Sequence, residues 1–296
     1  MPSQLEKIDY PAIAARAQGL ADRYTLPLSN HTWRGNPGDY AGTGAGSSLD
    51  FQDHRNYLPG DDPRHINWQA YARTGDYTLK LYREEVRPIV EIIMDVSGSM
   101  FSVPDKAERA IELLYFSFYS AERVGASAKV FLTNGPFRKA IETHTFLSHH
   151  WAQLALQEDS VKSSEAPTLG ALPFRQRSLR VFISDLLFNA APEHSVQALQ
   201  RNHGRALILC PFSPSESNPD WNGNYEFIDS EDRSHHDRRV DPPLLKRYIE
   251  TYRRHFDRWK AASIRAQTPF ARISSLGSFE EAVRKEAVPS GAIQLA

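Results

Sequence analysis

Apolar residues gather in four short runs along the last two-thirds of the chain. These strand-like runs occupy residues 89–94, 128–132, 179–184 and 206–210. Short, nearly continuous apolar runs are typical of parallel strands that are covered on both faces. Helical stretches separate the runs, so the pattern predicts an α/β fold with a doubly wound, mostly parallel sheet and helices on both faces.

The helical stretches show apolar residues that recur every three or four positions. They cover residues 107–121, 148–158 and 192–202, and a long helix follows from Pro242. Asp241 can cap this last helix, because aspartate and a following proline favour a helix start. Its apolar stripe comprises Leu245, Tyr248, Tyr252, Phe256 and Trp259. A short strand near 270–273 and a helix from Ser278 complete the predicted domain.

The beginning of the chain follows a different pattern. Residues 1–35 predict a helical lead-in, residues 36–50 are rich in Gly, Ser and Thr and predict a loop, and residues 77–86 predict a partly exposed strand. We therefore expect two parts: an N-terminal extension over residues 1–86 and the α/β domain over residues 87–292.

The composition limits the possible partners. The chain holds 35 Lys and Arg against 36 Asp and Glu, a net charge of −1, which argues against a general binder of nucleic acid or of an anionic membrane. Its single cysteine, Cys210, forms no internal disulfide. No apolar run approaches the ~20 residues of a membrane-spanning helix, and the N-terminus lacks a signal-peptide core. We expect a cytoplasmic protein without membrane insertion.

The strongest chemical signal directly follows the first apolar run. Asp95, Ser97 and Ser99 are spaced two residues apart, so an extended turn can direct all three oxygens toward one point. In open α/β sheets, sites form at the carboxyl ends of the strands. Oxygen ligands with few charges suit Mg²⁺ or Mn²⁺.

Two further oxygen-bearing residues belong to this prediction. Asp185 follows the strand-like run 179–184 and brings a second carboxylate to the same sheet edge, while Thr168 offers a hydroxyl in the preceding loop. Asp and Ser are also good helix N-caps, so a capped turn is the alternative at Asp95, and Thr168 could likewise cap a helix.

Together, these five positions resemble the metal-ion-dependent adhesion site of von Willebrand factor A domains. Asp95, Ser97 and Ser99 match the Asp-x-Ser-x-Ser turn of that family, Thr168 its loop threonine, and Asp185 its later aspartate. Leu169 stands where many relatives carry an additional Asp.

A longer block resembles the signature of the bacterial domain-of-unknown-function family 58, and the resemblance covers roughly residues 45–290. Its central motif reads Arg55-Asn56-Tyr57-Leu58-Pro59-Gly60-Asp61-Asp62-Pro63-Arg64, and it continues through Trp68 and Ala72-Arg73-Thr74 to Met100. Asn67 replaces the Asp that usually precedes Trp68.

The resemblance implies a non-enzymatic, metal-dependent binding module. In such a module the metal keeps an open position, which a carboxylate from a protein client can fill. Members of this family are often encoded with MoxR-type AAA+ ATPases, which implies an adaptor that links such an ATPase to a client during assembly or maturation.

The motif block itself has two interpretations. In the first, a structural clasp, Arg55, Arg64 and Arg73 pair with Asp53, Asp61 and Asp62, and Tyr57 and Trp68 pack on the sheet. In the second, Arg55, Tyr57, Asp61, Asp62, Arg64, Trp68 and Arg73 form a recognition surface next to the metal.

A metal-dependent hydrolase of the phosphatase type is the rival class. Asp95 would then act as nucleophile or metal ligand. However, Ser97 stands where the aspartyl-phosphatase pattern has a second Asp, and no lysine is convincingly placed. The Gly-x-Ser-x-Gly motif of a nucleophilic serine is also absent from the sequence. We therefore expect no enzymatic activity.

Overall fold

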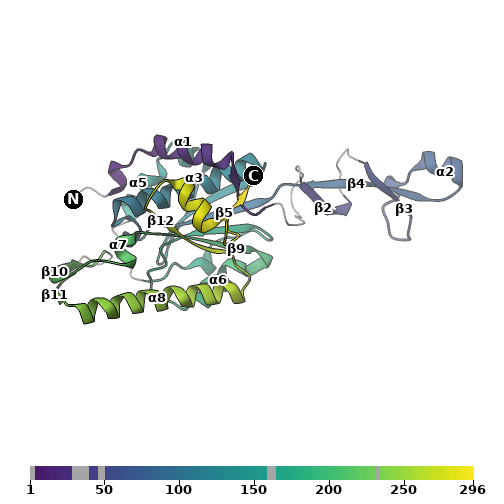
Figure 1. Cartoon of the computed structure of the whole chain (residues 1–296). Helices are drawn as coiled ribbons and strands as arrows, with labels where there is room; N and C mark the ends of the chain where they lie inside the picture. The colour runs from purple at the N-terminus through teal and green to yellow at the C-terminus, as the bar shows by residue number, and fades with distance from the viewer. Residues whose placement is uncertain (1–3, 29–39, 46–50, 159–164, 231–233) are drawn as a thin grey trace. The chain divides into compact units, whose positions relative to one another are not determined.

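The computed structural model describes residues 4–28, 40–45, 51–158, 165–230 and 234–296 (Figure 1). The chain forms two compact units. The large unit comprises residues 1–28, 89–124 and 128–296, and the small unit comprises residues 29–88 and 125–127.

A six-stranded sheet forms the centre of the large unit, with the strand order β12-β9-β8-β5-β6-β7. The strands are β5 (Ile89–Asp95), β6 (Ser127–Asn134), β7 (Phe137–Ile141), β8 (Leu179–Ile183), β9 (Arg205–Phe212) and β12 (Phe270–Ser274). Strands β12, β9, β8 and β5 are parallel, whereas β7 is antiparallel to β6. The predicted α/β class with a mostly parallel sheet is confirmed.

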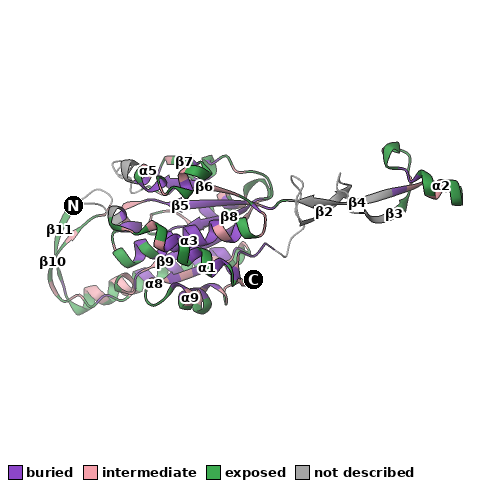
Figure 2. Ribbon diagram, turned by 90° about the horizontal axis from the view of Figure 1, so that it is seen from above, coloured by how far each residue is buried: buried purple, intermediate pink, exposed green. Residues whose placement is uncertain are grey.

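Helices cover both faces of this sheet (Figure 1). Helices α1 (Tyr10–Ala21) and α3 (Pro104–Arg123) lie on one face, and α6 (Pro192–Gln200) and α8 (Pro242–Arg265) lie on the other. All five residues of β8 and six of the seven residues of β5 are buried. Figure 2 shows both strands at the buried centre of the large unit. This two-sided burial explains why most residues of the two strands are apolar.

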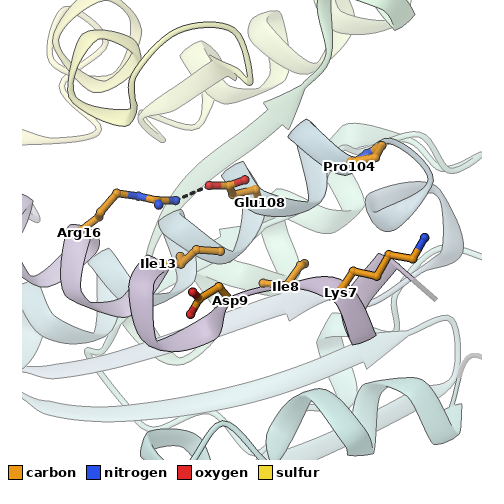
Figure 3. Close-up of a pocket in the computed structure, with 7 residues that line it drawn as sticks. All are labelled: Lys7, Ile8, Asp9, Ile13, Arg16, Pro104 and Glu108. Atoms are coloured by element: carbon orange, nitrogen blue, oxygen red, sulfur yellow. Dashed lines mark hydrogen bonds and ion pairs between the residues drawn. The ribbon is translucent and has the colours of Figure 1, made fainter. Parts of the chain in front are cut away.

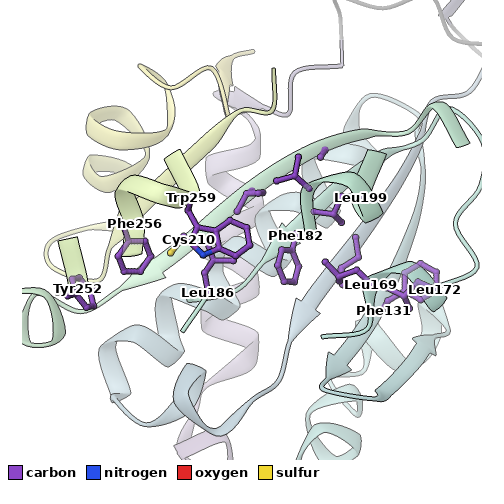
Figure 4. Close-up of a cluster of buried hydrophobic side chains, with 14 residues drawn as sticks. Phe131, Leu169, Leu172, Phe182, Leu186, Leu199, Cys210, Tyr252, Phe256 and Trp259 are labelled. Atoms are coloured by element: carbon purple, nitrogen blue, oxygen red, sulfur yellow. The ribbon is translucent and has the colours of Figure 1, made fainter. Parts of the chain in front are cut away.

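The start and the buried face of α8 agree with the sequence prediction. The Asp241 side chain accepts a hydrogen bond from the backbone N–H of Leu244 at 2.9 Å, and Pro242 occupies the first turn. Tyr252, Phe256 and Trp259 are buried against the sheet in one apolar cluster (Figure 4).

Residues 1–28 belong to the large unit, which differs from the boundary expected at residue 86. Helix α1 packs on α3 through buried side chains that include Ile13 and Leu20. Arg16 forms an ion pair with Glu108, drawn in Figure 3, and another with Glu112. Strand β1 (Tyr24–Thr25) pairs with β13 (Gln294–Leu295). These contacts link segments far apart in sequence, which local periodicity does not reveal.

The small unit contains a three-stranded antiparallel sheet with the order β2-β4-β3. Its elements are β2 (Tyr40–Ala45), β3 (Phe51–Asn56), a 3₁₀ turn (Pro63–His65), α2 (Trp68–Thr74) and β4 (Thr78–Val86). Strand β4 confirms the strand predicted at 77–86. The loop predicted over 36–50 is wrong at β2, where pairing with β4 outweighs the weak strand preference of glycine.

Two further groups of elements belong to the large unit. Helix α5 (Trp151–Glu158) confirms the helix predicted at 148–158. The short α4 (Thr143–Leu147) and the hairpin of β10 (Gly223–Ile228) and β11 (His235–Val240) were not predicted. The short α9 (Phe279–Ala282) follows the capping box of Ser278. Within the described ranges, no helix is both long and apolar enough to cross a bilayer.

Candidate metal centre

Asp95 is the last residue of β5, and its side chain is buried at the carboxyl end of the sheet. Its Oδ1 accepts a hydrogen bond from the backbone N–H of Ser97 at 2.9 Å, and its Oδ2 accepts one from the Ser184 hydroxyl at 2.7 Å. The hydroxyl oxygens of Ser97 and Ser99 lie 3.2 Å apart. The turn therefore gathers one oriented carboxylate and two hydroxyls.

Asp185 follows β8, the neighbour of β5, and is also buried. Its Oδ1 accepts a hydrogen bond from the backbone N–H of Leu187 at 3.2 Å, and its Oδ2 accepts one from Lys106 Nζ at 3.0 Å. The backbone N–H of Asp185 points to Met100 Sδ at 3.0 Å, which joins this loop to the Asp95 turn.

The loop after Asp185 stores backbone strain. Leu186 has a φ of 61°, which is unusual for a residue with a branched side chain. Three contacts hold it: its side chain is buried, its N–H donates to the Ser184 hydroxyl at 3.0 Å, and its carbonyl oxygen lies 2.8 Å from His255 Nε2. Strain of this kind gathers at functional sites, where neighbouring contacts enforce it.

Four of the five residues predicted as metal ligands line one cavity of about 330 Å³: Asp95, Ser97, Ser99 and Asp185. The remaining wall consists of Asn134, Gly135, Glu165, Pro167, Leu187, Phe188, Asn189, Asp229 and Ser230. The four predicted residues thus contribute oxygen atoms to the lining, while Leu187 and Phe188 contribute apolar side chains.

Thr168 is the fifth predicted ligand, and the structure places it beside this group. Its side chain is exposed, and its hydroxyl donates to the carbonyl oxygen of Gly135 at 3.1 Å. Glu165 and Pro167, which belong to the same loop as Thr168, line the cavity. Thr168 is the first residue before a 3₁₀ turn (Leu169–Ala171) but makes no side-chain capping bond.

The capping alternative does not describe the Asp95 turn. Ser97 precedes a 3₁₀ turn (Gly98–Phe101) without a side-chain capping bond, and α3 begins only at Pro104 after Val103. The Asp95 carboxylate bonds to the turn at Ser97 N and not to the first turn of α3.

The electrostatics of the cavity favour a cation. Burial, together with the nearby charge of Asp185, raises the pKa of Asp95 to about 7. Burial lowers the pKa of Lys106, but Asp185 and Glu216 more than offset this effect, so its pKa lies above the ordinary value. A positive ion between the two aspartates would relieve their repulsion.

The donor set fits a hard cation. It consists of two carboxylates and two hydroxyls, and Asn134 adds a buried amide oxygen that has no hydrogen-bond partner among the described residues. Oxygen ligands of this kind suit Mg²⁺ or Mn²⁺ better than Zn²⁺, which prefers His and Cys. Among the residues whose placement is described, no three His, Cys, Asp or Glu side chains form a metal-binding group.

Comparison with known proteins places the chain in a family. The family model described as "Protein of unknown function DUF58" matches residues 53–258 of the 296. The chain belongs to the DUF58 family. The DUF58 match extends over parts of both units.

Two solved structures are similar to this DUF58 protein at 14% sequence identity. The conserved hypothetical protein BatB from Bacteroides thetaiotaomicron covers 69% of this chain and 98% of its own, with a TM-score of 0.35. An aerotolerance-related membrane protein from Bacteroides fragilis NCTC 9343, with multiple mutations to serines, covers 61% of this chain and 98% of its own, with a TM-score of 0.32. No curated protein matches the chain.

The charged residues of the DUF58 motif block form two local pairs in the small unit. Arg55 makes two hydrogen bonds to Asp61, at 2.7 and 2.8 Å, and Arg64 contacts Asp62 at 2.7 Å. Asp61 also accepts the backbone N–H of Leu58 at 2.9 Å. The two pairs match the clasp interpretation.

Other parts of the clasp differ from the prediction. Arg73 Nε donates to the carbonyl oxygen of Gln69 at 3.3 Å, and the side chain of Asp53 lies outside the described residues. Trp68 was expected to pack on the sheet, and the structure leaves much of its surface exposed. It is 58% exposed at the start of α2, where it contacts the rings of Tyr71 and Tyr77.

The aromatic group of the small unit also includes Tyr57, whose ring lies 6.3 Å from that of Tyr77. Asn67, which stands where DUF58 relatives usually have Asp, caps α2 by accepting the backbone N–H of Ala70 at 3.2 Å. A role of this block in recognition stays a prediction.

Sequence reasoning missed Lys106, Asn134 and Glu216. Lys106 lies four residues before Ala110 and so extends the apolar stripe of α3 by one turn, and a charge on that stripe was the available signal. Asn134 ends β6 as Asp95 ends β5, and the position at a strand end was its signal. Glu216 carried no comparable local signal.

Proposed function

We propose that this DUF58 protein is a non-enzymatic, metal-dependent protein-binding module with a von Willebrand factor A-like fold. In chain order, its strands have the sheet order 3-2-1-4-5-6, the doubly wound arrangement. In that arrangement ligands bind where the strand order reverses, here between β5 and β8. Asp95 ends β5, and Asp185 follows β8.

One observation carries the proposal: Asp95, Ser97, Ser99 and Asp185 line the same cavity. These oxygens would hold Mg²⁺ or Mn²⁺, with Thr168 as a neighbouring hydroxyl. A divalent cation held by two carboxylates keeps positions for water. A carboxylate of a protein client would replace one of these waters, and the bound ion supplies the attraction.

We further propose an adaptor role in the cytoplasm, between a MoxR-type AAA+ ATPase and a client during assembly or maturation. Membership in the DUF58 family supports this role through the association that the sequence resemblance implies. The apolar side chains of Leu187 and Phe188, which line the cavity together with the polar residues, suit a protein partner.

One observation favours the hydrolase alternative: a lysine, Lys106, lies beside Asp185. However, its ammonium group is fully buried and is held by two carboxylates, Asp185 and Glu216. A lysine that stabilises a transferring phosphoryl group has to reach that group. The arrangement therefore favours the binding module.

The first expected result is a stabilisation by magnesium that depends on Asp95. If the dissociation constant is about 1 mM, 10 mM Mg²⁺ raises the free energy of unfolding by roughly 1.4 kcal/mol. This corresponds to a few degrees in melting temperature, measured by thermal denaturation. Asp95→Ala should lose this shift, and Asp257→Ala, which removes an exposed carboxylate of α8, should keep it.

The comparison uses the magnesium-dependent shift, because removal of a buried carboxylate changes the melting temperature by itself. Equal shifts in the wild type and in Asp95→Ala would contradict the metal site.

The same two proteins test the adaptor role: a AAA+ ATPase should co-purify with the wild type in Mg²⁺ and not with Asp95→Ala. Identical co-purification would refute that role.

The second expected result concerns pH. The pKa of Asp95 is raised to about 7, so without metal this group stabilises the fold below its unfolded pKa, and the contribution disappears as pH rises through 7. Protons compete with the metal for the carboxylate, so binding should be roughly 30-fold weaker at pH 5.5 than at pH 8. Isothermal titration calorimetry with Mg²⁺ at both pH values measures this ratio; a ratio near one rejects Asp95 as a ligand.

A further inference from the structure

Lys106 lies in the first turn of α3, and its side chain is fully buried. Its Nζ donates to Asp185 Oδ2 at 3.0 Å and contacts Glu216 Oε1. Lysine is almost never fully buried unless it is paired. The proposed function assigns Asp185 to the metal but gives no task to the ammonium group that contacts it.

Glu216 does not depend on Lys106 for its position. Its Oε2 accepts the backbone N–H of Ser213 at 3.1 Å, in the capping box that starts α7 (Pro214–Ser217). Its carbonyl oxygen accepts the hydroxyl of Tyr248 at 2.8 Å. Glu216 is thus a negative charge that the fold holds beside the buried ammonium group.

The ionised groups of this cluster can be counted. When all four groups are charged, Asp95, Asp185 and Glu216 contribute three negative charges and Lys106 one positive charge, so their sum is −3 + 1 = −2. A divalent cation neutralises these four groups, and the carboxyl groups of Glu165 and Asp229, which also line the cavity, are the same in every variant compared below. Without the lysine the sum is −3, and the cluster with its cation would still repel a carboxylate from a partner. Without the charge of Glu216 the sum is −1.

We propose that Lys106 and Glu216 together set the cation affinity of the site. Lys106 lowers the affinity because it neutralises Asp185, and Glu216 restores part of it because it draws the ammonium group away from Asp185. The resulting charge balance lets the site accept both a divalent cation and a partner carboxylate. This inference rests on the proposed function, since it requires Asp95 and Asp185 to bind the cation.

The experiment is a titration of the full chain with Mn²⁺, in which electron paramagnetic resonance measures the free ion. Lys106→Met should raise the Mn²⁺ affinity about tenfold, and Glu216→Gln should lower it about tenfold, because the affinity of an oxygen site follows its charge count. Gln keeps the capping box, which accepts Glu or Gln at this position.

Glu122→Gln is the matched control. It removes the same charge as Glu216→Gln, but from the helix α3 that carries Lys106. Glu122 is exposed and lies 16 residues after Lys106. Sixteen helical residues span about 24 Å, several times the Debye length of about 8 Å at physiological ionic strength. The Mn²⁺ affinity of this variant should equal that of the wild type.

The double variant Lys106→Met/Glu216→Gln keeps the test decisive if Lys106→Met alone does not fold. It removes one charge of each sign, so the sum stays at −2 and the affinity should return to the wild-type value. A purely structural role of the pair predicts weaker binding in both single variants and in the double variant, which would overturn the inference. If the wild type binds no Mn²⁺, the proposed function fails as well; if it binds and the variants do not differ, only this inference fails.

Discussion

Replacement of Arg180 by methionine is expected to lower the free energy of unfolding by about 3–5 kcal/mol, because it breaks a buried ion pair from one side. Arg180 on β8 and Glu91 on β5 both have fully buried side chains, and Arg180 Nε lies 3.3 Å from Glu91 Oε2. The guanidinium group also donates to three carbonyl oxygens at 2.6–2.8 Å: those of Arg175, Leu199 and Arg201.

The surroundings leave little room for compensation. A Cβ atom on Gly204 would lie 2.4 Å from Arg180 Cζ, so the guanidinium group fills the space in which a side chain would otherwise stand. Methionine cannot donate to the three carbonyl oxygens. Glu91 would keep the bonds from Arg175 N and the Ser178 hydroxyl but would lose its counter-charge.

Urea denaturation followed by circular dichroism measures this loss. The control is Arg265→Met, which opens the exposed ion pair with Glu193 and should cost less than about 1 kcal/mol. Adding Glu91→Gln to Arg180→Met should recover part of the stability, because the unpaired charge is removed. A loss below about 1 kcal/mol for Arg180→Met would mean that the pair adds nothing essential to the core.

The second large effect is expected for Trp259→Ala, at about 3–5 kcal/mol. Trp259 is fully buried in the cluster between α8 and the sheet (Figure 4), where its ring meets that of Phe188 edge to face at 5.9 Å. Its indole N–H has no hydrogen-bond partner, so the loss comes from apolar packing. Because Phe188 lines the cavity of the candidate metal centre, Trp259 also supports that wall.

Chemical denaturation of Trp259→Ala tests this expectation against Ile264→Ala on the same helix. Ile264 is 66% exposed, so its truncation should change the free energy of unfolding by less than about 0.5 kcal/mol. Trp259→Phe should retain most of the stability, because the ring still fills part of the space. Similar losses for Trp259→Ala and Ile264→Ala would show that the cluster is loosely packed.

The sheet of the large unit could be predicted because full burial leaves a local trace. Strands β5 and β8 are covered on both faces, so nearly every residue in them is apolar. Helix α8 could be predicted equally well from the sequence, since Asp241 and Pro242 mark its start. The hairpin β10–β11 could not be predicted, because most of its residues are exposed and polar and no short turn motif marks it in the sequence.

The same reasoning explains which parts of the candidate site were found. Asp95 and Asp185 each follow an apolar run, and the carboxyl ends of parallel strands meet at one edge. The pairing of Lys106 with Asp185 spans 79 residues, and its pairing with Glu216 spans 110. Contacts over such separations depend on the three-dimensional fold, and a single charge in a helix is usually solvated.

Strand β7 affects how strongly the protein tends to aggregate. It is an edge strand of the six-stranded sheet, and Arg138 and Lys139 are exposed near the middle of this strand. An exposed edge strand can pair with a strand of another molecule, and positively charged side chains oppose this pairing. At high concentration, repulsion at this strand should therefore protect the protein from edge-to-edge aggregation.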